Sequence, residues 1–199
     1  MSRKAVKKGD SGAILQLKIT LKRTKPPIWR RVQTPASTTL GMLHAIIQQS
    51  MGWADYHLHE FNVNGTLIGD PEQFCGPESD PETRVVDEAD VTLANLKRRG
   101  VKKFEYVYDY GDWWEHVVLL EKVLERDPDI HYPICVKAVK SGPPEDVGGI
   151  WGYYEMLEAL EDPEHPEHEE FSEWLPGGGW DPDNVDLDAI NRRLKYLNV

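Results

Sequence analysis

The sequence predicts an α+β protein with a β-grasp-like mixed sheet, one helix packed across that sheet, and a helical C-terminal extension. Three observations lead to this expectation. Apolar and polar residues alternate in the N-terminal half, a helix-like segment follows the first two strands, and the alternation is lost after residue 130. With 199 residues, 40% of them hydrophobic, the chain is long and apolar enough to bury a core.

The first two strands are predicted to form an antiparallel hairpin. The segment AILQLKITLKR places apolar side chains at alternate positions, which is typical of a strand with one buried face: Leu15, Leu17, Ile19 and Leu21. The prolines of TKPP end this strand because they cannot donate to a ladder, and IWRRVQTP returns as the second strand. On that strand Arg30 and Arg31 are expected on opposite faces, with Trp29 on the face of Arg31.

The helix is predicted in STTLGMLHAIIQQSMGW. Apolar residues recur there at spacings of three and four, namely Leu40, Leu43, Ile47 and Met51. A serine or threonine at positions 37–39 suits the N-cap, and Gly52 suits the C-terminal end. His44 shares the apolar face and is expected to be a hydrogen-bonded core residue.

Two further strand pairs and a short helix are predicted before residue 130. HLHEFNVNGTLIGD contains an Asn64-Gly65 hairpin turn, and KFEYVYDYGDWWEHVVLLEKVLE forms two strands joined by a tight turn at residues 109–112. Between these pairs, residues 70–90 are predicted to be an exposed acidic loop. VTLANLKRRG is expected to be a short helix or turn that ends at Gly100.

Composition divides the chain into three predicted parts: a basic flexible tail (residues 1–12), the β-grasp-like domain (residues 13–130), and an acidic helical extension (residues 131–199) packed on it as one structural unit. In the extension we expect no strand, two short helices interrupted by prolines, and a last helix near the C-terminus. Residues 1–103 hold 16 Lys and Arg against 11 Asp and Glu, whereas residues 104–199 hold 7 against 23. The acidic field and the net charge of −11 argue against nucleic acid as a partner, although the basic N-terminal region leaves that alternative open.

The sequence indicates a cytoplasmic protein with no membrane attachment. No run of residues approaches the roughly 20 apolar residues that a membrane span needs, and no secretory signal is recognisable. Cys75 and Cys135 are the only cysteines and are far apart in the sequence, which indicates neither a disulfide framework nor a cysteine zinc site.

Seven blocks of the sequence carry a family resemblance. In order, they are LKITLKRTKPPIWRRV, TLGMLHAIIQQSMGW, HLHEFNV, YVYDYGDWWEHVVLLE, YPICV, GPPEDVGGIWGYYEML and WDPDNVDLDAINRRL, within residues 13–197. This order resembles the plasmid pRiA4b ORF-3-like family, which implies a β-grasp-like domain with a C-terminal extension and an association with mobile elements, but little about activity. Many members place cysteines beside the PPED segment, where this chain has Gly142 and Val147, so the resemblance implies no cysteine-built metal site here. Some members carry a resolvase-type label, yet this sequence has no activated serine among arginines.

The densest polar cluster is DYGDWWEH. Asp109 and Asp112 suit the tight turn, since Asp side chains bond nearby backbone N–H groups. In the alternative interpretation, Asp112, Trp114 and His116 align on one strand face and bind a metal ion or a polar ligand.

His57 and His59 share a strand face in the same way. A His-x-His pair chelates zinc when a third ligand comes from elsewhere, and His116 or Asp112 is the candidate for that ligand. The favoured interpretation is a pair of partly buried histidines that hydrogen-bond across the sheet. If the histidines are only hydrogen-bonded, no cofactor is expected. If they chelate an ion, the cofactor is a divalent metal.

The loop GPPEDVGG combines stiff prolines with glycines that allow close backbone contact. Glu145 and Asp146 lie ahead of Gly148 and Gly149, where a helix is expected to begin. We interpret the segment as a rigid loop packed on the sheet domain, in which Glu145 or Asp146 caps the helix or pairs with an arginine of the second strand. The alternative is metal binding by Asp146 together with one of the three histidines named above.

The segment KPPIWRR carries a second candidate binding surface. Arg31 beside Trp29 would stack on nucleobases or grip phosphate. Pairing of Arg30 and Arg31 with acidic residues of the C-terminal half is the favoured interpretation, because the charge is divided between the two halves.

Three functions follow from these patterns. The favoured one is a non-catalytic binding or interaction module that engages a protein or peptide partner through its sheet edge or an aromatic groove. The first alternative is a metal-dependent hydrolase or nuclease, with the candidate residues His57, His59, Asp112, His116 and Asp146. The second is a DNA-binding accessory protein that uses the basic N-terminal region with Arg30 and Arg31. No P-loop, dinucleotide fingerprint, HExxH motif or nucleophile elbow favours an enzyme.

Overall fold

The alternating N-terminal segment forms β1 (Ala13–Leu21), which lies inside the sheet and not at its edge. It pairs antiparallel with β2 (Trp29–Pro35) on one side and with β7 (Trp114–Glu125) on the other. The predicted hairpin of the first two strands is therefore confirmed. The row of leucines and isoleucine of β1 is fully buried in the core, together with the apolar side chains of the helix at residues 40–51.

The computed structural model describes residues 12–74, 84–175, 180–197 and 199. The predicted basic tail, apart from residue 12, and the centre of the predicted acidic loop lie outside these residues. The other strands are β3 (His59–Val63), β4 (Thr66–Gly69), β5 (Val86–Asp87), β6 (Lys103–Tyr108) and β8 (Ile134–Val139). The helices are α1 (Leu40–Met51), α2 (Leu93–Arg98), α3 (Gly149–Glu161), α4 (His168–Trp174) and α5 (Leu187–Leu194), with 3-10 turns at Pro71–Phe74 and Glu88–Asp90.

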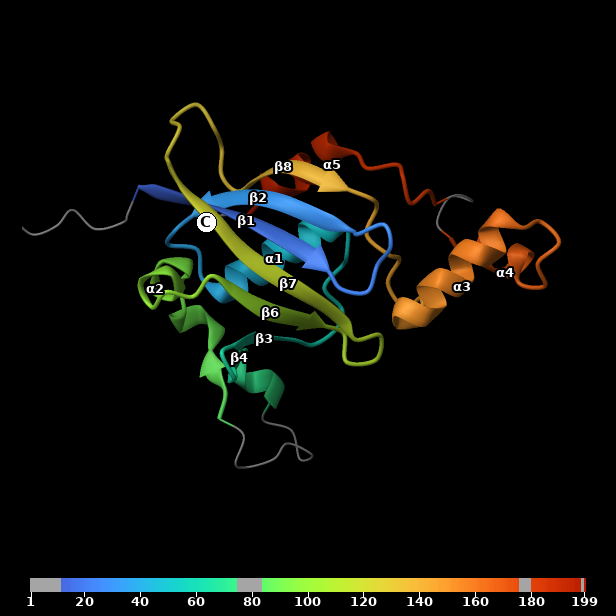
Figure 1. Ribbon diagram of the computed structural model, residues 1–199, viewed down its shortest axis with the longest axis horizontal. Coiled ribbons are helices and arrows are strands. Elements are labelled where there is room, and N and C mark those ends of the chain that lie inside the picture. The colour runs from blue at the N-terminus through green and yellow to red at the C-terminus, as the bar shows by residue number, and fades with distance from the viewer. Residues whose placement is uncertain (1–11, 75–83, 176–179, 198) are drawn as a thin grey trace, which may run out of the picture.

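The strands form one mixed sheet in the order β5-β4-β3-β6-β7-β1-β2-β8 (Figure 1). The β4–β5 pair is parallel and the other strand pairs of the described residues are antiparallel. The predicted α+β class with a mixed sheet is confirmed. Among the described residues, no helix has both the length and the apolarity that a membrane span requires.

α1 is the predicted helix across the sheet. The Thr39 side chain accepts a hydrogen bond from the Met42 N–H and caps the first turn. Gly52 ends the helix in the left-handed conformation, with φ of 95°, and its N–H bonds to the Gln48 carbonyl. Figure 1 shows α1 and α5 behind the sheet, where their apolar side chains and those of the strands form the core.

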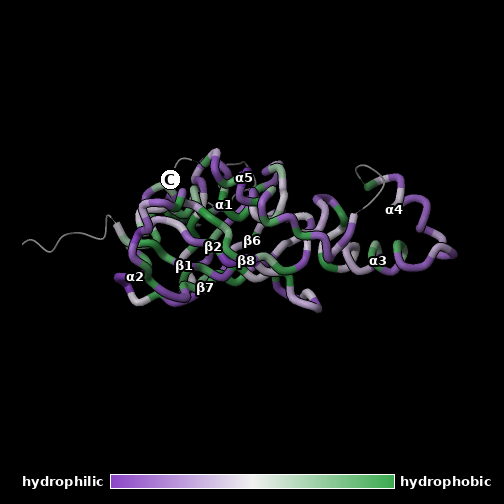
Figure 2. Tube along the Cα trace, turned by 90° about the horizontal axis from the view of Figure 1, so that it is seen from above, coloured by the Kyte–Doolittle hydropathy of each residue, from purple (hydrophilic) through white to green (hydrophobic). Residues whose placement is uncertain are grey.

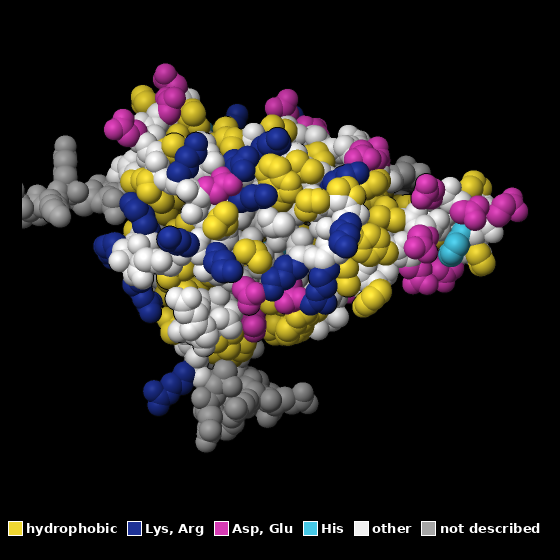
Figure 3. All heavy atoms as spheres, in the orientation of Figure 1, with side chains coloured by type: hydrophobic (Ala, Val, Ile, Leu, Met, Phe, Trp, Pro, Cys, Tyr) yellow, Lys and Arg dark blue, Asp and Glu magenta, His cyan; other side chains and the backbone are white. Residues whose placement is uncertain are grey.

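The opposite face of the sheet is open. Trp29 lies there among three cations, with Lys18 Nζ 4.7 Å, Arg31 Cζ 5.0 Å and Lys137 Nζ 5.5 Å from its ring centroid. Lys and Arg side chains are spread over this face in Figure 3. Arg31 also forms a bidentate ion pair with Glu121, so its guanidinium group is already engaged by a carboxylate of the same sheet.

The strand β8 contradicts the expectation that no strand follows residue 130. It pairs antiparallel with β2, and the register shifts by a bulge between Arg31 and Val32. Cys135 is buried while the adjacent Val136 and Lys137 are both exposed, so apolar and polar residues do not alternate. On the outer edge of β8, Asn191 of α5 donates to the Cys135 carbonyl and accepts from its N–H. This side chain closes the edge as a neighbouring strand would.

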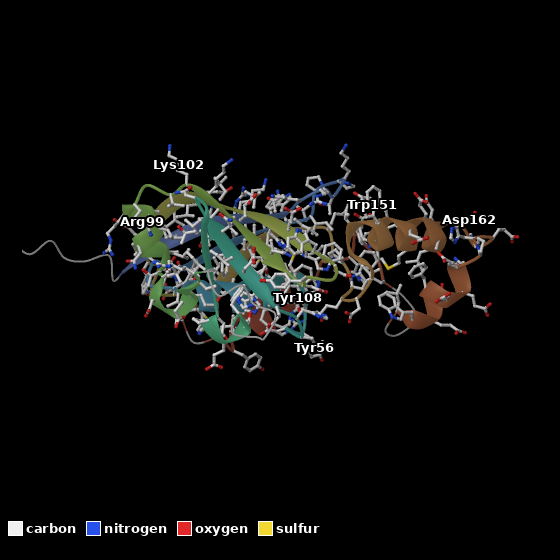
Figure 4. The ribbon with its side chains drawn as sticks, turned by 90° about the horizontal axis from the view of Figure 1, so that it is seen from below. Tyr56, Arg99, Lys102, Tyr108, Trp151 and Asp162 are labelled. Atoms are coloured by element: carbon white, nitrogen blue, oxygen red, sulfur yellow. The ribbon has the colours of Figure 1, made fainter. Side chains whose placement is uncertain are left out.

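α3 and α4 form an arm (residues 149–175) that projects from the sheet body (Figures 1 and 2). The arm has nine Asp and Glu and no Lys or Arg. Trp151 is 84% exposed, and Figure 4 places it near the base of the arm, with Asp162 at the far end. Pro163 and Pro166 separate the two helices, as predicted.

Arg30 joins three elements from inside the protein, where 1% of the residue is exposed. Its Nε donates to the Ser50 carbonyl at 2.7 Å, in the last turn of α1. Its Nη1 donates to the carbonyls of Trp29, Val139 and Lys140 at 3.1, 3.2 and 2.8 Å. The guanidinium therefore meets the negative end of the α1 dipole and connects β2 with the end of β8. Burial lowers the pKa of Arg30 to about 10.

Arg30→Gln is expected to destabilise the protein far more than Arg31→Gln, although the two residues are adjacent. Loss of the buried guanidinium leaves carbonyl groups without a donor, which costs about 1–3 kcal/mol for each unpaired group. Arg31 is partly exposed and pairs with Glu121, an interaction that contributes roughly 0–1 kcal/mol. Urea unfolding of the two variants measures the difference, and equal losses of stability would contradict the structural role of Arg30.

Candidate functional site

The segment GPPEDVGG, residues 142–149, lies flat against the sheet body, and we call it the clasp. A Cβ atom at Gly142 would overlap the Met51 carbonyl oxygen at the end of α1. A Cβ atom at Gly149 would overlap the Asp112 carbonyl oxygen in the β6–β7 turn, and Gly149 also has a positive φ of 67°. The close backbone contact predicted for the glycines is thus present at both ends of the clasp.

Three hydrogen bonds hold the middle of the clasp. Trp53 Nε1 donates to the Pro143 carbonyl at 2.9 Å. Glu145 accepts from the Ala54 N–H at 2.8 Å through Oε2 and from the Tyr108 hydroxyl at 2.6 Å through Oε1. Burial and the bond to Glu145 raise the pKa of Tyr108. Glu145 therefore pairs with a backbone amide and a phenol, and not with an arginine of β2 as expected.

Asp146 lies beside His57 and Asp109. His57 Nε2 is 3.1 Å from Asp146 Oδ1 and 3.6 Å from Asp109 Oδ2. One ligand atom from each of the three residues lies within 4.8 Å of the others. Asp109 is buried, and its other oxygen accepts a hydrogen bond from the Gly111 N–H in the turn. Asp109 therefore serves the turn, as predicted, and also faces His57.

Asp112 adds a third carboxylate to the neighbourhood. Its Oδ2 is buried and has no hydrogen-bond partner among the described residues. Burial raises the pKa of Asp112, and the charges of Asp109 and Asp146 act in the same direction. Hydrogen bonds from the Gly149 and Gly148 backbone lower the pKa of Asp112 and offset part of this increase. Three carboxylates thus share one region with a single imidazole.

The group has the donors of a divalent-cation site. His57 Nε2 is buried and makes no hydrogen bond within the described residues, although it lies next to two carboxylates. Imidazole nitrogen with carboxylate oxygen is a ligand set that suits zinc, manganese or ferrous iron. The Asp146 side chain is 65% exposed, so an ion has access from solvent.

The other predicted ligands do not join this group. His59 Nε2 lies 2.8 Å from Glu88 Oε2, and its ring stacks on His44 at 3.5 Å. His44 in turn bonds to the Tyr106 hydroxyl and to Asp55. His59 and His44 are therefore hydrogen-bonded, buried histidines, as the favoured interpretation of His59 and the expectation for His44 held.

His116 is fully buried, with its ring edge-on to Trp53. Its Nδ1 lies 3.0 Å from the Trp114 carbonyl, to which it donates, and its Nε2 has no partner among the described residues. Burial lowers the pKa of His116 to about 3, so the ring is neutral at neutral pH. Trp114 is buried as well, and it stacks on Trp53. The predicted set of His57, His59, His116 and Asp112 is therefore not assembled at one point.

Sequence reasoning missed a cavity of about 550 Å³ on the other side of the clasp. It is bounded by the end of α1, the clasp, the end of α4 and the N-terminal part of α5. Arg30, Trp174, Trp180 and Arg193 are among its lining residues. Seven tryptophans in a chain of this length predict that most of them are buried or line a groove. The residues that line this cavity come from segments far apart in the sequence, so no local pattern brings them together.

Comparison with known proteins gives relatives whose names assign no activity. The family model described as Plasmid pRiA4b ORF-3-like protein matches residues 13–189. The uncharacterized protein y4hQ of Sinorhizobium fredii is 35% identical over 185 residues, which are 93% of this chain and 92% of that protein. The crystal structure of MM3350 from Methanosarcina mazei Go1, a protein of unknown function, is 41% identical with a TM-score of 0.78 and covers 89% of this chain and 97% of that one.

The His116→Leu variant is expected to lose less free energy of unfolding than the wild type as the pH falls. A neutral buried imidazole contributes stability that is present above the unfolded pKa of 6.5 and is lost as the pH falls towards the folded pKa of about 3. Between these values the wild type should lose about 1.4 kcal/mol more per pH unit than the variant. Urea unfolding across this pH range measures both slopes, with the exposed His131→Leu as control. Parallel slopes for wild type and His116→Leu would show that His116 titrates normally.

Proposed function

The chain belongs to the plasmid pRiA4b ORF-3-like family, and from that premise we propose that it is a non-catalytic binding module whose clasp binds a divalent cation. The observation that carries the proposal is the convergence of His57, Asp109 and Asp146, whose ligand atoms lie within 4.8 Å of one another. These residues come from the segment before β3, the β6–β7 turn and the clasp. A cation bound to them would tie the clasp to the sheet body.

The charges of the group favour a cation. Asp109, Asp112 and Asp146 bring up to three negative charges together, and His57 supplies at most one positive charge. Two buried atoms of the group, His57 Nε2 and Asp112 Oδ2, have no hydrogen-bond partner among the described residues. Unpaired buried polar atoms are costly, and a divalent ion satisfies the nitrogen directly while it offsets the excess negative charge.

We prefer a binding role to hydrolysis because two acid–base groups at the clasp, Tyr108 and Glu145, already bond to each other. Tyr108 donates to Glu145, and Glu145 also accepts from the Ala54 N–H. A hydrolase would need a general base free to reach a metal-bound water. Asp112, whose Oδ2 has no hydrogen-bond partner among the described residues, is the carboxylate that keeps hydrolysis as the alternative. The metal-dependent hydrolase therefore stays the second candidate, favoured by the solvent exposure of Asp146.

Two of the residues expected to contact DNA, Arg30 and Arg31, are engaged within the protein, whereas most of the basic N-terminal tail lies outside the described residues. Arg30 is buried and bonds to backbone carbonyls, and Arg31 is paired with Glu121. Addition of a peptide strand along β8 is also disfavoured, because Asn191 occupies both backbone groups of Cys135. The clasp and its two sides are thus the surfaces that we propose for binding.

Purified protein is expected to bind about one equivalent of Mn²⁺ or Zn²⁺ after treatment with a chelator. His57→Gln and Asp109→Asn should each weaken this binding by about 10-fold or more, because each removes one of three ligands. Isothermal titration calorimetry measures the affinity, and the exposed His131→Gln serves as the matched control.

Two results would contradict the proposal. Binding that survives in His57→Gln and Asp109→Asn would place the ion elsewhere. Hydrolysis of bis(p-nitrophenyl) phosphate or p-nitrophenyl acetate by the Mn²⁺-loaded protein, lost in His57→Gln but kept in His131→Gln, would replace the non-catalytic role with the hydrolase.

A further inference from the structure

We propose that the cavity between the clasp, α1 and α5 binds a small aromatic carboxylate, with its charged group against Arg30 and Arg193 and its ring against Trp174 and Trp180. This site is separate from the proposed cation site, which lies on the His57 side of the clasp. Its volume of about 550 Å³ is within the range of about 300–1,000 Å³ that is typical of small-molecule sites.

The positive end of the cavity is built by two guanidinium groups. Arg30 is almost completely buried, and its Nε and Nη1 bond to backbone carbonyls. No carboxylate pairs with it among the described residues. Arg193 lines the same cavity, and its Nε donates to the Gln49 carbonyl at 3.0 Å. Among the described residues neither guanidinium group pairs with a carboxylate, and the end of the α1 dipole compensates only part of the positive charge.

The ionisable groups around Arg30 agree with an excess of positive charge. Burial is the main cause of its lowered pKa, and the nearby Arg193 acts in the same direction. The ionisable group that acts against this is the Cys135 thiol, whose own pKa is raised by burial and which is therefore neutral at neutral pH. A carboxylate in the cavity would pair with the two guanidinium groups through charge-assisted hydrogen bonds.

Two acidic side chains also line the cavity, and both are engaged. Glu145 accepts from the Tyr108 hydroxyl and from the Ala54 N–H. Asp186 caps α5 by accepting from the Ala189 N–H, and its second oxygen lies 3.4 Å from Arg192. Within the part of the chain that the structure describes, neither carboxylate pairs with the two guanidinium groups that line the cavity.

Apolar and aromatic side chains form part of the other walls, together with polar residues such as Ser141 and Asn184. Trp174 is 44% exposed although it lies beside the buried Leu175. Trp180 meets Tyr153 edge-on at 5.8 Å and leaves part of its ring open. Pro143 and Ile190 complete the surface. Flat apolar walls beside two guanidinium groups fit a ligand that joins an aromatic ring to a carboxylate.

Benzoate and 2-naphthoate, each compared with its neutral amide, test the charge requirement by isothermal titration calorimetry. The titrations contain a chelator, so that their outcome is independent of the proposed cation. The carboxylates should bind about 10-fold or more tightly than benzamide and 2-naphthamide, because only the acids form charge-assisted bonds. Arg193→Gln should weaken binding of both acids by about 10-fold or more, and Trp180→Ala should weaken 2-naphthoate more than benzoate.

The exposed Lys195→Gln, at the end of the same helix, removes one positive charge outside the cavity lining and is the control that should bind as the wild type does. Arg30 is not substituted in this test, because it joins α1, β2 and the end of β8. Absence of binding by both acids at about 1 mM would overturn the proposal. So would equal binding of acids and amides, or equal effects of Arg193→Gln and Lys195→Gln.

Discussion

Close backbone contact at the two ends of the clasp is the constraint on which the rest of the structure depends. Gly142 lies against Met51 at the end of α1, and Gly149 lies against Asp112 in the β6–β7 turn. Side chains at either position would push the loop away from the sheet body. With both ends fixed and two prolines between them, the clasp has little freedom to move Glu145 or Asp146 out of place.

This fixed loop separates charges of opposite sign. On one side Asp146 joins Asp109 and Asp112 around His57, and on the other side Arg30 and Arg193 face a cavity. A flexible loop would let these acidic and basic side chains pair with one another. Such pairing would remove the excess negative charge around His57 and the excess positive charge at the cavity. Like charges held together in a rigid frame cost stability, and natural proteins keep such arrangements mainly at sites that bind a ligand or an ion. The clasp therefore contributes residues to both proposed sites, Asp146 to the cation site and Pro143 to the carboxylate site.

The strands and helix of the N-terminal half could be predicted because each has a local signal. The leucine row of β1, the cap at Thr39 and the Asn64-Gly65 turn depend on neighbouring residues only. β8 had no such signal, since the bulge opposite Arg31 and the cover provided by Asn191 are tertiary features. An edge strand that is covered by a side chain from a distant helix does not need the alternation of apolar and polar residues by which other strands are recognised.

Individual residues of the candidate site could be predicted from the sequence, but which of them lie together in space could not. Asp109, Asp146 and His57 were each singled out from local patterns, but their meeting point depends on how the clasp crosses the turn. His59 was grouped with His57 by alternation, yet β3 begins at His59, so the two histidines do not share a strand. Arg30 of β2 was expected to be available to the clasp. It instead donates hydrogen bonds to backbone carbonyls of β2 and β8.

Anomalous diffraction from crystals soaked in Mn²⁺ tests the central claim most directly, because it locates the ion without reference to affinity or activity. We predict one anomalous peak bounded by His57 Nε2, Asp109 Oδ2 and Asp146 Oδ1, with the clasp in the position described above. A peak at any other acidic surface, with no density among these three atoms, would contradict the assignment of the clasp as a cation-binding element.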